Sequence, residues 1–285
     1  MPETGRIAPI DITPIDIAFL VFDGFQPIDL AGPWQAFVTA NEESGQQRYR
    51  LVTCGSADVA ATTGPGLRLQ VDLGLAESLA RDFHTVIVPG GEGVHRLAAR
   101  PDIRDWLRAA DATTRRTCSV CTGAFLLAEA GLLDGRRVTT HWRAAEQLQQ
   151  RFPALQVCGE LIYSESGKYW TSAGVTAGID LALTLIERDG GRHLAQRVAR
   201  RLVVPLRRDG DQRQYSQALR AQDRAGAPFS ELVGRLMAAP SRRWTIDEMA
   251  ELCHMSRRTF QRRFKASFGL PPLVALRQLR DETVR

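Results

Sequence analysis

A cysteine lies where a short apolar strand meets a predicted helix. Cys121 ends the strand-like run RTCSVC at residues 116–121 and precedes a helical stretch over 122–133. Ser119 and Gly123 lie two residues away on either side, and a sharp strand-to-helix turn requires such small side chains. The turn would lift Cys121 into the crevice at the strand ends, where a helix N-terminus stabilises a thiolate. We therefore expect Cys121 to be a reactive thiol of lowered pKa.

Backbone and side-chain groups from other segments are candidates for the same crevice. Residues 84–91 predict a second buried strand that runs into glycines, whose N–H groups are suited to an oxyanion site. Asp29 and His141 are the other polar candidates. The residues predicted to form the ligand or oxyanion site are Gly90, Gly91, Glu92, Cys121 and Thr122.

The remaining cysteines do not indicate a metal or redox site. Cys118 and Cys121 spell C-x-x-C, but no second pair follows, and a strand that leads into an elbow points the two side chains apart. Cys54, Cys158 and Cys253 are typical of small buried hydrophobic residues. We predict no metal and no cofactor.

The order of the elements predicts an α/β fold. Strands are predicted over 15–22, 49–54, 67–72, 84–91, 116–121 and 136–142, with a hairpin over 156–174. Helices are predicted over 29–43, 101–112, 122–133, 143–151, 175–188 and 191–204. Strands that alternate with helices favour a doubly wound, mostly parallel sheet covered on both faces.

Composition indicates the cellular compartment of the protein and the charge of its partner. The N-terminus does not resemble a signal peptide, and no apolar run reaches the roughly 18 residues of a membrane span. Five cysteines without framework spacing indicate a reducing compartment, so we expect a cytoplasmic protein. The net charge of +5 arises in residues 230–285, which hold 11 Arg and Lys against 6 Asp and Glu. Residues 1–229 hold 26 of each, so the C-terminal segment is the expected contact for a polyanion.

Several ordered motifs of the first 204 residues resemble one family. They are DLAGP at 29–33, VPGG at 88–91, SVCTGAF at 119–125, AEAGLLDG at 128–135, TTHW at 139–142 and GVTAGID at 174–180. Together they look like the ThiJ/PfpI superfamily, over about residues 14–204. The resemblance implies a flavodoxin-like domain of the class-I glutamine amidotransferase type and a homodimer formed through that domain.

The same resemblance offers two roles for the crevice. Peptidases of the family carry His directly after the elbow cysteine, where this chain has Thr122. The isocyanide hydratase pattern, which pairs an elbow Cys-Thr with the Asp of an Asp-Leu-x-Gly-Pro motif, is closer, and it implies that Cys121 is the nucleophile and Asp29 the acid/base. Alternatively, Cys121 only lines the pocket of a small-molecule effector, and this reading is favoured by the C-terminal domain. His141 fits a structural role as well as a catalytic one.

Residues 245–269 predict a helix-turn-helix. Thr245 and Glu248 form a capping box that opens the first helix, over 246–253. Ser256 caps a second helix over 257–267, which ends at Gly269. Apolar residues at helical spacing would pack the two helices together. The alternative for the segment is a solvated basic tail.

The second of these helices is basic and contains no acid. Its predicted DNA-binding residues are Arg257, Arg258, Gln261, Arg262, Arg263 and Lys265. Arg258, Gln261 and Arg262 are expected to face base edges because Phe260 and Phe264 must point inward, and Arg and Gln side chains read bases in the major groove. We expect the other three to contact phosphates of double-stranded DNA.

The run MSRRTFQRRF at 255–264 closely resembles the first helix-turn-helix of AraC/XylS-family activators. That motif behind a ThiJ/PfpI domain looks like the GlxA-type transcription regulators. Their second helix-turn-helix is absent, because the sequence ends in what resembles the joining helix, Val274–Arg285. We predict a sensing domain at 14–204, a linker at 205–227 and a DNA-binding domain at 228–285. The alternative is a hydratase or hydrolase with an incidental basic tail.

Overall fold

The chain divides into two units by its internal contacts. A computed structural model describes residues 13–56, 59–61, 66–207, 229, 231–233, 235–236 and 242–283. The units span Met1–Arg208 and Asp209–Arg285, and we refer to them as the N-terminal and C-terminal units. Of the predicted linker 205–227, residues 208–227 lie outside the described part, so its boundaries stay a prediction.

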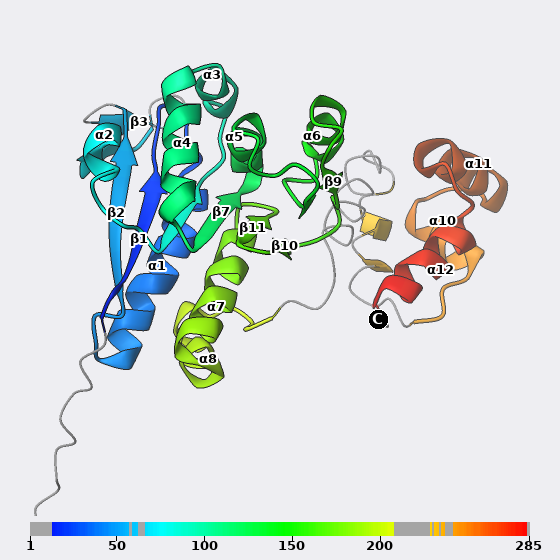
Figure 1. Cartoon of the computed structure of the whole chain (residues 1–285). Helices are drawn as coiled ribbons and strands as arrows, with labels where there is room; N and C mark the ends of the chain where they lie inside the picture. The colour runs from blue at the N-terminus through cyan, green and yellow to red at the C-terminus, as the bar shows by residue number, and fades with distance from the viewer. Residues whose placement is uncertain are drawn as a thin grey trace, which may run out of the picture. The chain divides into compact units, whose positions relative to one another are not determined.

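A seven-stranded sheet forms the centre of the N-terminal unit (Figure 1). Its order is β10-β11-β7-β6-β1-β2-β5, and every neighbouring pair is parallel except the β10/β11 hairpin. The strands are β1 (Ile15–Leu20), β2 (Tyr49–Gly55), β5 (Leu73–Gly74), β6 (Thr85–Val88), β7 (Arg116–Val120), β10 (Tyr163–Ser166) and β11 (Tyr169–Ser172). The predicted mostly parallel sheet is confirmed.

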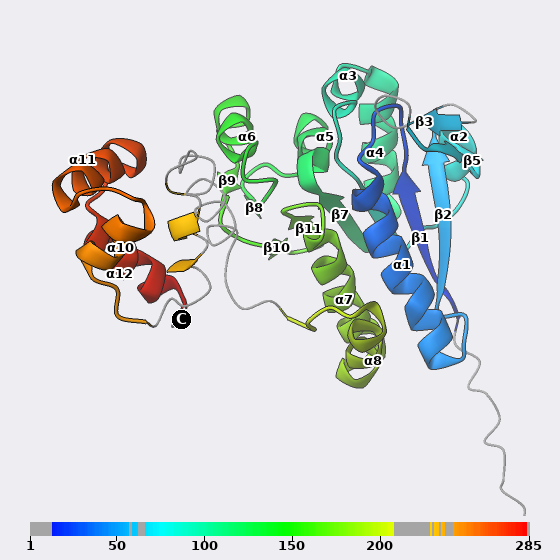
Figure 2. The same ribbon diagram turned by 180° about the vertical axis from the view of Figure 1, so that it is seen from behind.

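Helices cover both faces of this sheet, as predicted. The helices described in this unit are α1 (Pro27–Ser44), α2 (Leu75–Ser78), α3 (Val94–Ala98), α4 (Pro101–Thr113), α5 (Ala124–Glu129), α6 (Ala145–Arg151), α7 (Ala177–Gly190) and α8 (Arg192–Leu202). Helices α1, α7 and α8 pack together on one face, and α3, α4 and α5 on the other (Figures 1 and 2). The strand ends therefore lie between two helical layers.

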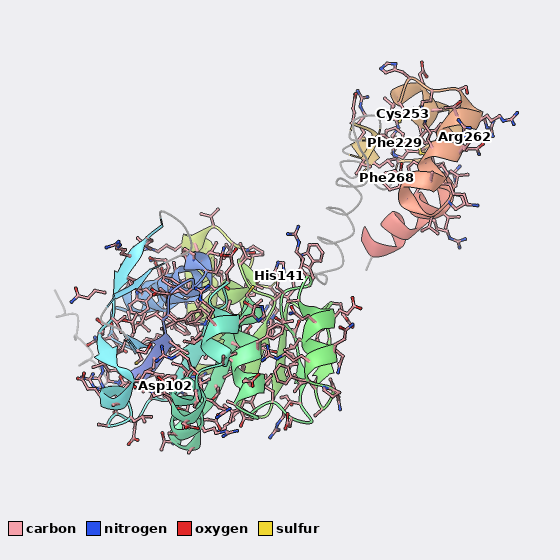
Figure 3. All side chains as sticks on the ribbon, turned by 90° about the horizontal axis from the view of Figure 1, so that it is seen from above. Asp102, His141, Phe229, Cys253, Arg262 and Phe268 are labelled. Carbon is pink, nitrogen blue, oxygen red and sulfur yellow. The ribbon has the colours of Figure 1, made fainter. Side chains whose placement is uncertain are left out.

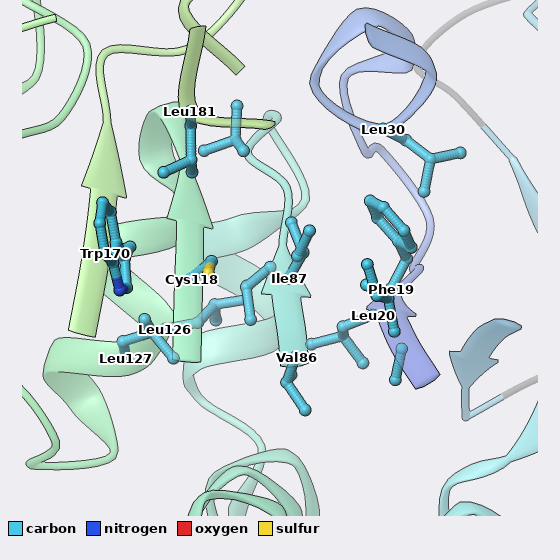
Figure 4. Packing of buried hydrophobic residues seen from close by; sticks show 14 of the residues in the cluster. Phe19, Leu20, Leu30, Val86, Ile87, Cys118, Leu126, Leu127, Trp170 and Leu181 are labelled. Carbon is cyan, nitrogen blue, oxygen red and sulfur yellow. The ribbon is translucent and has the colours of Figure 1, made fainter. Parts of the chain in front are cut away.

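The central strands are apolar because both of their faces are covered. Ile17 to Leu20 of β1 are fully buried, and every residue of β6 and β7 is buried. Figure 4 shows Phe19, Ile87 and Trp170 among the packed side chains of this core. The core fixes where β6 and β7 end, and thereby the place of the glycines and the cysteine that follow them.

The strand predicted over 136–142 is much shorter than expected. Residues 136–142 form only β8 (Arg137–Val138), which pairs with β9 (Gln156–Val157) in a small separate sheet; a second such pair is β3 (Val59–Ala61) with β4 (Arg68–Gln70). After β8, hydrogen bonds that involve threonine side chains replace the backbone pairing of a strand. The Thr139 N–H donates to Thr171 Oγ1 at 2.8 Å, and Thr140 Oγ1 donates to the Cys121 carbonyl at 2.7 Å.

The C-terminal unit contains the predicted helix-turn-helix. Its helices include α10 (Ile246–Leu252), α11 (Arg257–Phe268) and α12 (Pro272–Thr283), the last where the joining helix was expected at Val274–Arg285. The Thr245–Glu248 capping box is present, and Gly269 ends α11 with φ +75°. Phe229, Phe260 and Phe264 form the aromatic centre of a separate small core; Figure 3 labels Phe229, Phe268 and Arg262 of this unit.

Candidate functional site

Cys121 occupies the predicted elbow. It follows β7 directly, opens a three-residue 3-10 turn and has a φ of 57°, a left-handed conformation that costs a non-glycine residue free energy. Glycines make room for it. A Cβ on Gly174 would lie 2.3 Å from the Cys121 Cβ, and a Cβ on Gly90 would lie 2.8 Å from the same atom. The elbow therefore depends on glycine at both neighbouring positions.

Asp29 lies against the thiol, in the first turn of α1. Its carboxylate is fully buried and accepts hydrogen bonds from the N–H groups of Gly90 at 3.2 Å and Val175 at 2.7 Å. The Cys121 thiol bonds to the same carboxylate. Burial raises the pKa of Asp29, whereas the three hydrogen bonds lower it.

The predicted low pKa of Cys121 is wrong in this structure. Burial and, after it, the charge of Asp29 raise its pKa to about 12, and the Thr122 N–H only partly opposes them. Burial also raises the pKa of Cys118 to about 12, so nothing in the pKa values singles out Cys121 as the reactive thiol.

The amides predicted to form an oxyanion site already have acceptors within the protein. The Gly90 N–H donates to Asp29, and the Gly91 N–H donates to Thr122 Oγ1 at 2.9 Å. Thr122 thereby ties the elbow to the loop after β6. Glu92 is exposed on this loop. The structure therefore brings Asp29, Thr122 and the glycines to Cys121, but it does not leave the glycine amides free.

His141 does not join this group. It is half-buried, its Nδ1 accepts the Arg143 N–H at 3.4 Å, and its ring lies 5.6 Å from that of Trp142 (Figure 3 labels His141). Burial and the charge of Arg143 lower the pKa of the imidazole, which favours its neutral form. The preceding residue, Thr140, is the one that reaches the elbow.

Sequence reasoning missed Thr140, Gly174 and Val175 as parts of the site. Gly174 and Val175 both have positive φ, which turns the Val175 N–H toward Asp29. The motifs at 139–142 and 174–180 were the available signals, and they indicated a family and not a contact. Within the described residues, no group of three or more His, Cys, Asp or Glu side chains could hold a metal ion.

The predicted DNA-reading side chains lie on the outer face of α11. All six are exposed: Arg257, Arg258, Gln261, Arg262, Arg263 and Lys265. Phe260 and Phe264 are buried on the opposite face. Arg257 forms an ion pair with Asp247 of α10 at 3.4 Å, so this arginine also braces the two helices.

Comparison with known proteins decides the family. Residues 16–188, more than half of the chain, match the DJ-1/PfpI family. The chain belongs to the DJ-1/PfpI family. Behind this DJ-1/PfpI domain, residues 239–272 match the bacterial regulatory helix-turn-helix proteins of the AraC family.

The relatives of the chain include transcription regulators and an enzyme. The chain is 30% identical to the HTH-type transcriptional regulator GbdR of Pseudomonas aeruginosa, over 97% of this chain and 77% of that protein. It is 34% identical to the isonitrile hydratase of Pseudomonas putida, over 65% of this chain and 76% of that enzyme. A ThiJ/PfpI family protein from Pseudomonas syringae shares the fold with a TM-score of 0.62 at 24% identity, over 73% of this chain and 84% of that one. The protein is thus a DNA-binding transcription regulator of the AraC type with a DJ-1/PfpI domain.

Within the described residues, no helix has the length and apolarity to cross a membrane.

Proposed function

We propose that the DJ-1/PfpI domain binds a small-molecule effector at the Cys121 crevice and does not catalyse a reaction. The observation that carries this proposal is the hydrogen bond between the Cys121 thiol and the buried Asp29 carboxylate, which keeps the thiol protonated near neutral pH. Two further observations support a binding role: the Gly90 and Gly91 amides already have acceptors, and the imidazole of His141 bonds to the Arg143 N–H.

We further propose that effector binding changes how the C-terminal unit meets DNA. In this unit Arg258, Gln261 and Arg262 contact base edges, while Arg257, Arg263 and Lys265 contact phosphates. Their exposure on α11, opposite the buried Phe260 and Phe264, supports the assignment. The protein acts as a homodimer through its DJ-1/PfpI domain, in the cytoplasm where the DNA is.

An isonitrile hydratase-like activity is the second candidate. The juxtaposition of Cys121, Thr122 and Asp29 favours it, together with the 34% identity to that enzyme. In this reading Asp29 takes the thiol proton as Cys121 attacks the substrate carbon.

One experiment separates the two functions. Fragments of the DNA upstream of the protein's own coding sequence are titrated with the full chain at two salt concentrations, and isocyanide turnover is assayed in parallel. Salt-sensitive, sequence-dependent binding without turnover is expected. Turnover of about 1 per second or faster, lost in Cys121→Ala, would establish the enzyme instead.

A further inference from the structure

A histidine lies at the edge of the sheet opposite the Cys121 crevice. His84 directly precedes β6, and its ring is half-buried. Its backbone carbonyl accepts the N–H groups of Arg115 at 3.1 Å and Arg116 at 3.0 Å, where β7 begins. At about 3.3 Å per residue along β7, this place lies roughly 16 Å from Cys121. His84 therefore takes no part in the site described above.

Arg116 joins β7 to the end of α7 through a buried ion pair. Its guanidinium donates to the two carboxylate oxygens of Asp189, at 2.9 Å and 2.8 Å. The side chains of the pair are only 11% and 13% exposed. Tyr49 of β2 donates its hydroxyl to the same carboxylate at 3.2 Å. Asp189 therefore fastens the C-terminal end of α7 to two strands of the sheet.

The hydrogen bonds of this cluster require a neutral imidazole. Arg116 Nη2 lies 3.2 Å from His84 Nδ1, and a guanidinium can only donate, so Nδ1 must be the acceptor. The Thr85 hydroxyl accepts the Arg116 Nε–H at 3.2 Å, which leaves its own proton for the same Nδ1 at 3.0 Å. A proton on Nδ1 would place a third donor against these two.

The charges that face His84 also oppose its protonation. Burial and then the charge of Arg116 lower the pKa of the imidazole, and Arg115 lowers it by a smaller amount. The charge of Asp189 raises the pKa, but this carboxylate already pairs with Arg116 and is poorly placed to neutralise a second cation. Because the ring is only half-buried, solvent protons reach it in the folded protein.

We propose that protonation of His84 releases the C-terminal end of α7 and the turn into α8 from the sheet. An imidazolium repels the Arg116 guanidinium and removes its acceptor, so the pair with Asp189 opens. Helix α8 follows α7 after Gly191, and the two helices lie side by side (Figure 2). The far end of α8 stays on α1, because Arg201 pairs there with Glu42 at 2.7 Å. The opening is therefore local, and it requires neither DNA nor an effector at Cys121.

Hydrogen–deuterium exchange of the full chain at pH 8.0 and pH 5.5 tests the proposal, with rates corrected for intrinsic exchange. Below about pH 6.5 the opened cluster binds a proton that the closed one excludes, so the opening constant rises by up to about tenfold per pH unit. We expect corrected exchange at the end of α7 to be about three- to tenfold faster at pH 5.5. Amides of α4, on the other face of the sheet, are the internal reference.

Two variants separate His84 from other acid effects. His84→Asn supplies an acceptor oxygen that does not titrate, and it should abolish the increase at the end of α7. The matched control is His193→Asn, which removes an exposed histidine of α8 and should retain the increase. An equal response to acid in the wild type and His84→Asn would overturn the proposal.

The wild type alone also decides the question if His84→Asn does not fold. Faster exchange confined to the end of α7 and the turn into α8 supports the proposal. An equal increase in α4 would show that acid unfolds the whole unit, and no increase would show that the ion pair survives protonation of His84. Either result contradicts the proposed release.

Discussion

At the scale of single residues, Cys121 and Asp29 form a hydrogen-bonded pair of a protonated thiol and a carboxylate. They are not a thiolate beside a base. Asp29 accepts hydrogen bonds from the N–H groups of Gly90 and Val175 and from the Cys121 thiol, so the proton stays on the thiol and the negative charge rests on the carboxylate. This charge, together with burial, raises the pKa of Cys121 to about 12. Removing the charge of Asp29 must therefore make the thiol more acidic.

We expect Asp29→Asn to speed alkylation of Cys121 by iodoacetamide about tenfold at pH 8. Loss of a neighbouring negative charge worth about one pKa unit raises the thiolate fraction tenfold. In the wild type, the rate should still increase at pH 10 because the thiol titrates near 12. Peptide mass mapping measures both rates, with the half-buried Cys158 as internal control. An unchanged or slower rate at Cys121 would show that Asp29 does not control the thiol.

Gly174→Ala should destabilise the N-terminal unit far more than Gly135→Ala. Both glycines have positive φ, which costs alanine about 1–2 kcal/mol. Only the Cβ at position 174 meets another atom, the Cys121 Cβ at 2.3 Å, which adds about 1–3 kcal/mol of overpacking; the Cβ at 135 meets nothing within 4 Å. Urea unfolding followed by circular dichroism compares the two variants. Equal midpoints would mean that the elbow tolerates a side chain at 174.

At the scale of elements, the sequence predicted helix ends well where neighbouring residues alone determine them. The ends of α10 and α11 follow from caps and a C-terminal glycine, so Thr245, Ser256 and Gly269 could be read from sequence. The strand expected over 136–142 is short because the Thr139 N–H and the Thr140 side chain bond to residues from distant parts of the sequence. The acceptors of the Gly90 and Gly91 N–H groups, Asp29 and Thr122, could not be predicted because they also come from distant parts of the sequence.

Two substitutions on α11 should act differently on DNA. Arg262→Ala should relax sequence preference at one base pair, by about 1–3 kcal/mol of discrimination. Lys265→Ala should weaken binding to all sequences alike and reduce the salt dependence by about one phosphate contact. Electrophoretic mobility shifts on cognate and scrambled DNA at several salt concentrations distinguish the two patterns. Identical behaviour of the variants would invalidate the assignment of α11 side chains to bases and phosphates.

At the scale of the whole molecule, charge and chemistry are divided between the two units. The excess positive charge lies in residues 230–285, whereas Cys121 and Asp29 belong to a unit of balanced charge. Composition alone predicted this division.

Cys121→Ala should therefore leave DNA affinity and its salt dependence unchanged in the absence of effector. The substitution removes no charge, since the thiol is protonated at neutral pH, and it lies outside the basic segment. Fluorescence anisotropy on labelled DNA measures both quantities, and Arg262→Ala is the positive control for lost binding. A large drop in affinity of the Cys121 variant would show that the crevice supports the DNA-binding state even when empty.

The two hydrophobic cores share no residue within the described part of the chain. In evolutionary terms, substitutions can accumulate in one core without unfolding the other. A lineage could therefore change the molecule recognised at the elbow while its recognition helix kept the same operators, or keep the molecule and acquire new operators. Selection can act on what is sensed and on which genes respond as two separate traits of one polypeptide.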